Sequence, residues 1–226
     1  MSAVFITATG TDIGKTFVSA GLIRHWRGAG RPIDAIKPVV SGFDPAGWLE
    51  SDPALLLKAL DRPVTLAEAE RISPSRFKAP LSPHMAAQRE NRAIVFQEVI
   101  EFCRGAMAAA RNGMLLIEGI GGIMVPLDDR RTVLDWMSVL RIPIVLVAGS
   151  YVGTISHTLT ALEILARRNL NVAAVVVSES AGSAAALDET VASVERFANS
   201  IDVVGIPRLA PDARDDAAFA RIAALI

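Results

Sequence analysis

The 226-residue sequence has little of what marks secreted or membrane-spanning proteins. Its one cysteine, Cys103, excludes a disulfide within the chain, and the surrounding segment VIEFCRGAMAAA indicates a helix with a buried thiol. No apolar run approaches the roughly 18 residues needed to cross a bilayer. The N-terminus also has no basic segment followed by an apolar stretch. We therefore expect a cytoplasmic protein.

The chain also lacks an excess of charge of either sign. The chain has 23 Lys and Arg against 24 Asp and Glu, a net charge of −1, which favours neither nucleic acid nor an anionic membrane as a partner. A small ligand is expected instead. Hydrophobic residues make up 51% and charged residues 21%, which predicts a folded chain. The length fits one large α/β domain, and without repeats or linkers we expect a single domain over residues 1–226.

Short apolar runs alternate with longer amphipathic stretches, which is typical of βα units around a buried parallel sheet. The expected strands cover residues 4–8, 33–39, 114–119, 142–149, 172–179 and 202–207. The expected helices cover residues 15–30, 93–111, 132–140, 156–168, 183–198 and 216–225. Residues 40–91 are expected to be irregular. The pattern predicts a three-layer α/β fold, a mostly parallel central sheet flanked by helices, with ligands beyond the carboxyl ends of the strands.

The segment TATGTDIGKT at residues 7–16 follows the first expected strand and leads into a helix, as a phosphate-binding loop does. Gly14 lets the backbone approach a phosphate, and the start of the helix adds its positive end. Lys15 would neutralise β- and γ-phosphate charge, and Thr16 would place a hydroxyl on Mg²⁺. The common loop has glycine at position 9, where this chain has Thr9. The alternative is an ordinary strand-to-helix turn with a solvated lysine.

Other polar groups follow later strands. In IKPVVSG, Lys37 and Ser41 could face an anionic substrate, although a solvated lysine and a turn serine are the alternative. In LLIEGIGG, Glu118 at the tip of a buried strand needs a partner, and Mg²⁺ beside a nucleotide would be one. A solvated Glu118 in a glycine-rich turn is the alternative there. Asp52, which follows Ser51 and opens a helical pattern, is locally typical of a helix cap.

The motifs T-x-T-x-T-x-x-GKT, KPVVSG, an SD-containing loop, FKAPLSPHMAA, EGIGG and GTISH, in this order, resemble the dethiobiotin synthase family. The resemblance runs from the first strand to VVGIPRLAP. That family has a phosphate loop one residue longer than the common one, typically TGTDTGVGKT. Ala8, Gly10 and Asp12 then stand where the family has glycine, aspartate, and glycine or glutamate. Alanine at position 8 requires a negative φ, and Gly10 is expected to supply the flexibility instead.

The resemblance implies a P-loop NTPase-like fold and an ATP-dependent ring closure in biotin biosynthesis. The substrate 7,8-diaminononanoate takes up CO₂ as a carbamate, the carbamate attacks the γ-phosphate, and the second amine attacks the resulting anhydride. The products are dethiobiotin, ADP and phosphate. Such phosphoryl transfer brings two anions together, so cations and positioning carry the catalysis. The family implies ATP and CO₂ as co-substrates, Mg²⁺ as cofactor, and a homodimer with its active site at the subunit interface.

The resemblance also assigns roles to individual residues. Catalysis is expected from Lys37, Lys15 and Thr11, and Mg²⁺ binding from Thr16, Asp52 and Glu118. The expected nucleotide-binding residues are Asp12, Ile13, Gly14, Lys15, Thr16, Phe17, Asp52, Glu118, Gly119, Ile120, Gly121, Ser178, Glu179, Pro207, Arg208 and Leu209. The expected substrate-binding residues are Ser41, Lys37, Gly121, Gly122, Val152, Gly153 and Ser156.

Two positions depart from the family pattern. Asparagine is familiar just before the histidine of GTISH, where this chain has Ser156. Some members recognise adenine with an Asn-Asp pair, where this chain has Ser178 and Glu179. A serine offers one rotating hydroxyl in place of the fixed donor and acceptor of an amide. We therefore expect ATP to be used together with another triphosphate.

Two alternatives share parts of this pattern. A partition-type nucleotide-switch ATPase acts through ATP-controlled dimerisation and has an extra lysine at the equivalent of Gly10, which this chain lacks together with a basic amphipathic tail. An amidoligase of corrinoid synthesis would be followed by an amidotransferase domain with a catalytic cysteine, which we do not expect here.

The histidines and tryptophans are expected to have structural roles. His84 in PLSPH and His157 in TISH match family motifs, and we expect them to hold loops by hydrogen bonds, with proton transfer as the alternative. Trp26, Trp48 and Trp136 are expected to pack in the interior.

Overall fold

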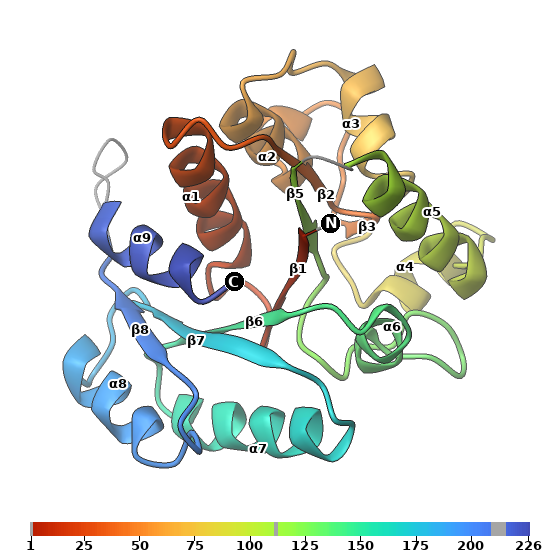
Figure 1. Cartoon of the computed structure of the whole chain (residues 1–226). Helices are drawn as coiled ribbons and strands as arrows, with labels where there is room; N and C mark the ends of the chain where they lie inside the picture. Colours follow the sequence, from red (N-terminus) through yellow and green to blue (C-terminus); the bar gives the residue numbers. More distant parts are fainter. Residues whose placement is uncertain (1, 111–112, 209–215) are drawn as a thin grey trace.

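The computed structural model describes residues 2–110, 113–208 and 216–226. Its centre is a six-stranded sheet in the order β2-β5-β1-β6-β7-β8, with helices on both faces (Figure 1). The bounds of these strands are β1 Ser2–Ala8, β2 Ile33–Ile36, β5 Met114–Glu118, β6 Ile144–Gly149, β7 Val172–Ser178 and β8 Val203–Ile206. All of their pairings are parallel, so the carboxyl ends of all six strands lie at one edge of the sheet.

Helices α1, α2 and α9 cover one face of the sheet, and α5, α6, α7 and α8 cover the other (Figure 1). The bounds are α1 Lys15–Gly28, α2 Asp52–Leu60, α3 Leu66–Ile72, α4 Pro83–Arg89, α5 Phe96–Ala109, α6 Val133–Leu140, α7 Thr154–Arg167, α8 Leu187–Glu195 and α9 Asp216–Ala224. The predicted three-layer α/β fold with a mostly parallel sheet is confirmed. None of the helices in the described ranges is both long enough and apolar enough to cross a membrane.

The core forms because the central strands are apolar on both faces. All five residues of β5 and all six of β6 are buried, as a parallel sheet between two helical layers requires. The ring of Phe5 on β1 meets Trp136 of α6 edge to face at 4.9 Å. Trp26, Trp136 and Cys103 are fully buried, and Trp48 is 9% exposed, so the predicted packing of these residues is confirmed.

The strand predicted over residues 33–39 is wrong in its second half. β2 ends at Ile36, and the Lys37 N–H bonds to the carbonyl of Ile72 at 2.9 Å instead of to the sheet. Pro38 has no N–H to continue the ladder. The chain then forms β3 (Val39–Ser41), which pairs in parallel with β4 (Ser75–Phe77) in a separate two-stranded sheet. The Lys37 side chain is therefore placed where the chain leaves the central sheet.

The expectation that residues 40–91 are irregular is also wrong. This stretch contains a 3₁₀ turn at Trp48–Glu50, the helices α2, α3 and α4, and the strand β4. These helices have seven to nine residues each, and prolines and turns separate them, so no long apolar period marks them in the sequence. Their folding gives α2 a fixed start at Asp52, which is one of the candidate site residues.

Candidate active site

The phosphate-loop segment connects β1 to α1 and turns at two of its residues. Ala8 ends β1 without a positive φ, as predicted. The prediction that Gly10 supplies the flexibility is wrong, because the left-handed positions are Asp12 at φ 56° and Gly14 at φ 97°. A Cβ at Gly14 would also lie 2.6 Å from the Ser178 hydroxyl oxygen. Glycine at 14 is therefore required by both backbone angle and space.

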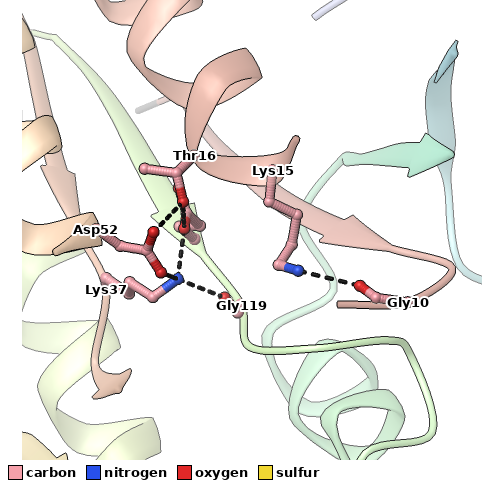
Figure 2. Close-up of polar contacts among 7 residues, drawn as sticks. Gly10, Lys15, Thr16, Lys37, Asp52 and Gly119 are labelled. Carbon is pink, nitrogen blue, oxygen red and sulfur yellow. Dashed lines mark hydrogen bonds and ion pairs between the residues drawn. The ribbon is translucent and has the colours of Figure 1, made fainter. Parts of the chain in front are cut away.

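Four side chains from different elements meet beside this loop. Thr16 is in the first turn of α1, Lys37 follows β2, Asp52 is the first residue of α2, and Glu118 is the last residue of β5. They meet because β2, β5 and β1 are neighbours in the sheet and their carboxyl ends coincide. Figure 2 shows the Lys37 ammonium and the Thr16 hydroxyl directed at the Asp52 carboxylate.

The Lys37 ammonium forms an ion pair with both acids. Its Nζ lies 2.7 Å from Asp52 Oδ2 and 2.5 Å from Glu118 Oε1, and 3.5 Å from the carbonyl oxygen of Gly119. The side chains of Lys37 and Glu118 are 3% and 0% exposed, whereas the Asp52 side chain is 41% exposed. Burial opposes both charges, but the carboxylates raise the pKa of Lys37 and the ammonium lowers the pKa of Asp52.

Lys15 lies on the other side of the same space. Its Nζ donates to the carbonyl oxygen of Gly10 at 3.2 Å (Figure 2). Burial, together with the nearby positive charge of Lys37, lowers the pKa of Lys15 to about 8. Lys37 is already paired with Asp52 and Glu118, so Lys15 is the cation of this space that an incoming phosphate would meet first.

The Thr16 hydroxyl lies within hydrogen-bond distance of two carboxylate oxygens but can donate to only one of them. Thr16 Oγ1 lies 2.7 Å from Asp52 Oδ1 and 2.8 Å from Glu118 Oε1, but a hydroxyl has only one hydrogen to donate. Glu118 Oε2 is buried and has no hydrogen-bond partner. A hydroxyl, two carboxylates and phosphate oxygens suit Mg²⁺, which binds through one or two carboxylates plus substrate phosphates. These residues therefore fit the cation that the sequence predicts.

Asp52 is not a helix cap. The N-cap of α2 is Ser51, and the Ser51 hydroxyl donates to the carbonyl of Trp48 at 2.5 Å. The Asp52 carboxylate instead reaches Lys37 and Thr16. The local interpretation of Asp52 as a cap is wrong, because the tertiary contacts decide where its side chain points.

Two neighbouring cavities contain most of the expected ligand-binding residues. The first, which we call the lysine cavity, measures about 360 Å³. It is lined by Thr11, Asp12, Gly14, Lys15, Thr16, Phe17, Lys37, Ser41, Asp52, Ile120 and Gly121. The second, the serine cavity, measures about 530 Å³. It is lined by Asp12, Ile13, Gly14, Phe17, Tyr151, Ser178, Glu179, Ser180, Ala181, Pro207 and Arg208. The two share three lining residues, Asp12, Gly14 and Phe17, and therefore adjoin.

Some expected residues lie outside these cavities. A Cβ at Gly122 would lie 3.1 Å from the carbonyl oxygen of Thr9, so Gly122 packs against the phosphate loop. Val152, Gly153 and Ser156 are exposed around the start of α7 and line neither cavity. Leu209 is outside the described residues. A further cavity of about 550 Å³ between α5 and residues 128–131 contains none of the expected residues.

Sequence reasoning missed Tyr151, Ser180 and Ala181, all of which line the serine cavity. They directly follow β6 and β7, so the rule that ligands bind beyond strand ends could have indicated them. His84 and His157 each make a hydrogen bond of the kind that the loop-holding prediction requires. His84 Nδ1 lies 3.0 Å from the Ser82 hydroxyl, and His157 Nδ1 lies 2.9 Å from the hydroxyl of Tyr151.

The fold and the loop define a class, the nucleotide-binding α/β proteins, and comparisons with known proteins agree. Residues 2–211 match the model of a family described as "AAA domain". The MinC:MinD cell division complex of Aquifex aeolicus has a TM-score of 0.57 at 13% identity, with 98% of this chain and 86% of that chain covered. A ParA family ATPase of Chlorobium tepidum has a TM-score of 0.55 at 14% identity, with 99% and 98% covered. At these identities the likeness shows the fold alone.

Curated relatives identify the family within this class. An ATP-dependent dethiobiotin synthetase of Caulobacter vibrioides is 45% identical over 208 residues, 92% of this chain and 93% of that protein. One of Acidiphilium cryptum is 51% identical over 179 residues, 79% of this chain and 80% of that protein. The chain belongs to the ATP-dependent dethiobiotin synthetase family, whose members are ligases. The partition-type ATPase alternative is not favoured.

Proposed function

We propose that this chain converts 7,8-diaminononanoate and CO₂ into dethiobiotin, with ATP cleaved to ADP and phosphate. The observation that carries the proposal is the paired Lys37 ammonium, which lies in the same cavity as Lys15 and Ser41. A reaction between a carbamate and a triphosphate needs cations on both anions. The lysine cavity offers two, beside a loop built to bind phosphate.

The proposed reaction has three bond-forming steps. One substrate amine attacks CO₂ and loses a proton, which gives a carbamate. A carbamate oxygen then attacks the γ-phosphorus, and ADP leaves with the electrons of the broken P–O bond. The second amine attacks the carbonyl carbon of this carbamic-phosphoric anhydride and loses a proton, phosphate leaves with the electrons of the broken C–O bond, and the ring closes.

In this proposal the two lysines have different tasks. Lys15 holds the β- and γ-phosphates, since it belongs to the loop and lies close to Gly10. Lys37 draws the carbamate towards the γ-phosphate and stabilises the charge that develops between them. Ser41 donates a hydrogen bond at the reacting end of the substrate, and Thr11 lies near the reacting phosphate.

The Mg²⁺ that we propose would be held by Thr16, Asp52 and Glu118. When bound, it would neutralise charge on the β- and γ-phosphates. Lys37 contacts one oxygen of each of these acids, and we propose that its ammonium moves from between them when a divalent cation binds. That movement would leave Lys37 free to face the substrate.

We also propose that the active unit is a homodimer in the cytoplasm. Val152 is 86% exposed and Ile155 is 38% exposed, next to the exposed Gly153 and Ser156. This apolar start of α7 lines neither cavity of its own chain. The Ser156 hydroxyl and the backbone amides of this segment would contact the distal carboxylate of a substrate bound to a second copy of the chain.

The test is incubation with 7,8-diaminononanoate, ¹³C-bicarbonate, Mg²⁺ and ATP. Dethiobiotin with one ¹³C is expected by mass spectrometry. Lys37→Ala should abolish product while it keeps nucleotide binding, and the matched control Lys58→Ala, an exposed lysine of α2, should behave as the unmodified protein. A folded, nucleotide-binding protein that makes no dethiobiotin would overturn the proposal, and an active Lys37→Ala would refute the role of Lys37.

A further inference from the structure

The serine cavity has an aromatic wall that the family resemblance does not assign. Tyr151, the only tyrosine of the chain, lines this cavity in the turn between β6 and α7. The cavity adjoins the lysine cavity across Asp12 and Gly14. A nucleotide with its phosphates over Lys15 would therefore extend its base into the space beside Tyr151.

The backbone around Tyr151 is held from both sides. The Ser150 N–H donates to the Ser180 hydroxyl at 3.0 Å, and the Ser180 N–H donates to the Ser150 hydroxyl at 2.9 Å. After the turn, the buried Thr154 hydroxyl donates to the carbonyl of Gly149 at 2.7 Å. These bonds join the ends of β6 and β7 to the start of α7, so the turn that presents Tyr151 is fixed before any ligand arrives.

The ring of Tyr151 is held as well. Its hydroxyl lies 2.9 Å from His157 Nδ1, one turn into α7. A Cβ at Gly149 would lie 2.7 Å from Cδ1 of Tyr151, which places the ring over that glycine. A ring fixed at its base and at its hydroxyl loses little conformational entropy when a ligand contacts it.

The polar groups of the serine cavity are poorly suited to distinguish one base from another. The Glu179 carboxylate accepts a hydrogen bond from the backbone N–H of Arg208 at 2.8 Å, which occupies one of its two oxygens. Ser178 offers a hydroxyl that can rotate, beside Gly14. A fixed donor and acceptor pair, such as an amide side chain would supply, is missing among the cavity-lining residues given above. Contact with the face of a base is then the larger source of affinity.

We propose that Tyr151 is a nucleotide-binding residue whose ring contacts the base, and that this contact tolerates different bases. Stacking on an aromatic ring is insensitive to base identity because every base has a π-face. The inference rests on the proposed use of a nucleoside triphosphate. It accounts in physical terms for the expected use of another triphosphate beside ATP.

The first test measures binding without the diamine, by calorimetry with the Mg²⁺ complexes of ATP, GTP, CTP and inorganic triphosphate. Tyr151→Ala should weaken the three nucleotides by a similar factor, about 5- to 100-fold, and leave inorganic triphosphate unchanged. Tyr151→Phe keeps the ring and should stay within about threefold of the unmodified protein. Unchanged nucleotide binding by Tyr151→Ala, or an equal loss of inorganic triphosphate, would overturn the inference.

The second test does not depend on a variant that must fold. With one tyrosine in the chain, 3-fluorotyrosine gives a single ¹⁹F resonance for Tyr151. ATP should shift this resonance by the ring current of its base, while inorganic triphosphate should not. A resonance that ATP leaves in place would refute the contact.

Failure of this inference and of the proposed function can be told apart. Nucleotide binding that depends on Tyr151 in a protein that makes no dethiobiotin would refute the proposed function alone. Dethiobiotin formation by Tyr151→Ala with an unchanged KM for ATP would refute the inference alone.

Discussion

Lys37→Met tests whether the Lys37 ammonium is the resident counter-ion of the two acids. Thr16 Oγ1 lies 2.7 Å from an Asp52 oxygen and 2.8 Å from a Glu118 oxygen, so those oxygens are at most about 5.5 Å apart. Two unit charges at that distance repel by about 3 kcal/mol at an effective dielectric constant of about 20. The Asp52 side chain is 41% exposed, and screening reduces this to about 1 to 2 kcal/mol.

The lost cation should make the site bind divalent cations more tightly in the absence of nucleotide. In the proposed site a divalent cation displaces Lys37 from the acids of the unmodified protein, whereas in Lys37→Met it relieves the repulsion between them. Since about 1.4 kcal/mol is tenfold in affinity, we expect about a 10-fold lower Kd for Mn²⁺, a substitute for Mg²⁺ at oxygen ligands. Electron paramagnetic resonance of free Mn²⁺ measures this Kd without any turnover.

The controls separate this effect from a change in fold. Lys58→Met removes an exposed lysine of α2, the helix that begins at Asp52, and should leave the Mn²⁺ affinity unchanged. Without metal, Lys37→Met should lower thermal stability, because the buried Glu118 loses its partner, and Mn²⁺ should restore it. An equal or weaker Mn²⁺ affinity in a folded Lys37→Met protein would refute the reasoning.

Three further predictions concern other positions. Asp52→Ala should weaken Mg²⁺-dependent ATP binding in calorimetry at least 10-fold. Loss of a helix cap alone would instead lower the stability of the fold by about 1 kcal/mol. Burial raises the pKa of Cys103 to about 12, so the folded protein keeps the thiol protonated while the unfolded chain ionises it above about pH 9. Stability should then fall with pH between these values by about 1.4 kcal/mol per unit, and urea unfolding at pH 8 and 10.5 should show a shallower fall in Cys103→Val. Gly21→Ala should lower the midpoint of urea unfolding, because a Cβ there would lie 2.0 Å from the Phe219 ring; an unchanged midpoint would show that α9 moves aside without cost.

The alternation of apolar runs and amphipathic stretches was enough to predict the class of fold. Buried parallel strands must be apolar on both faces, and this requirement is visible in the sequence as continuous apolar runs such as VAAVVVS at Val172–Ser178. The phosphate loop is also a local feature, because Gly14, Lys15 and Thr16 act within one strand-to-helix turn. Even there, the sequence did not indicate the left-handed φ at Asp12. Aspartate adopts such an angle more often than most residue types, but it does so in only a small share of positions.

The sequence by itself determined the strands of the central sheet, apart from the early end of β2, together with the longer helices and the type of phosphate loop, because each depends on neighbours along the chain. Only the tertiary structure decided the partners of Lys37 and the wall that Tyr151 gives to the serine cavity. Thr16 and Glu118 are 102 residues apart, and the strand order β2-β5-β1 brings them together. Strand order depends on how whole layers pack, and a buried charge takes whichever partner the packing leaves within reach.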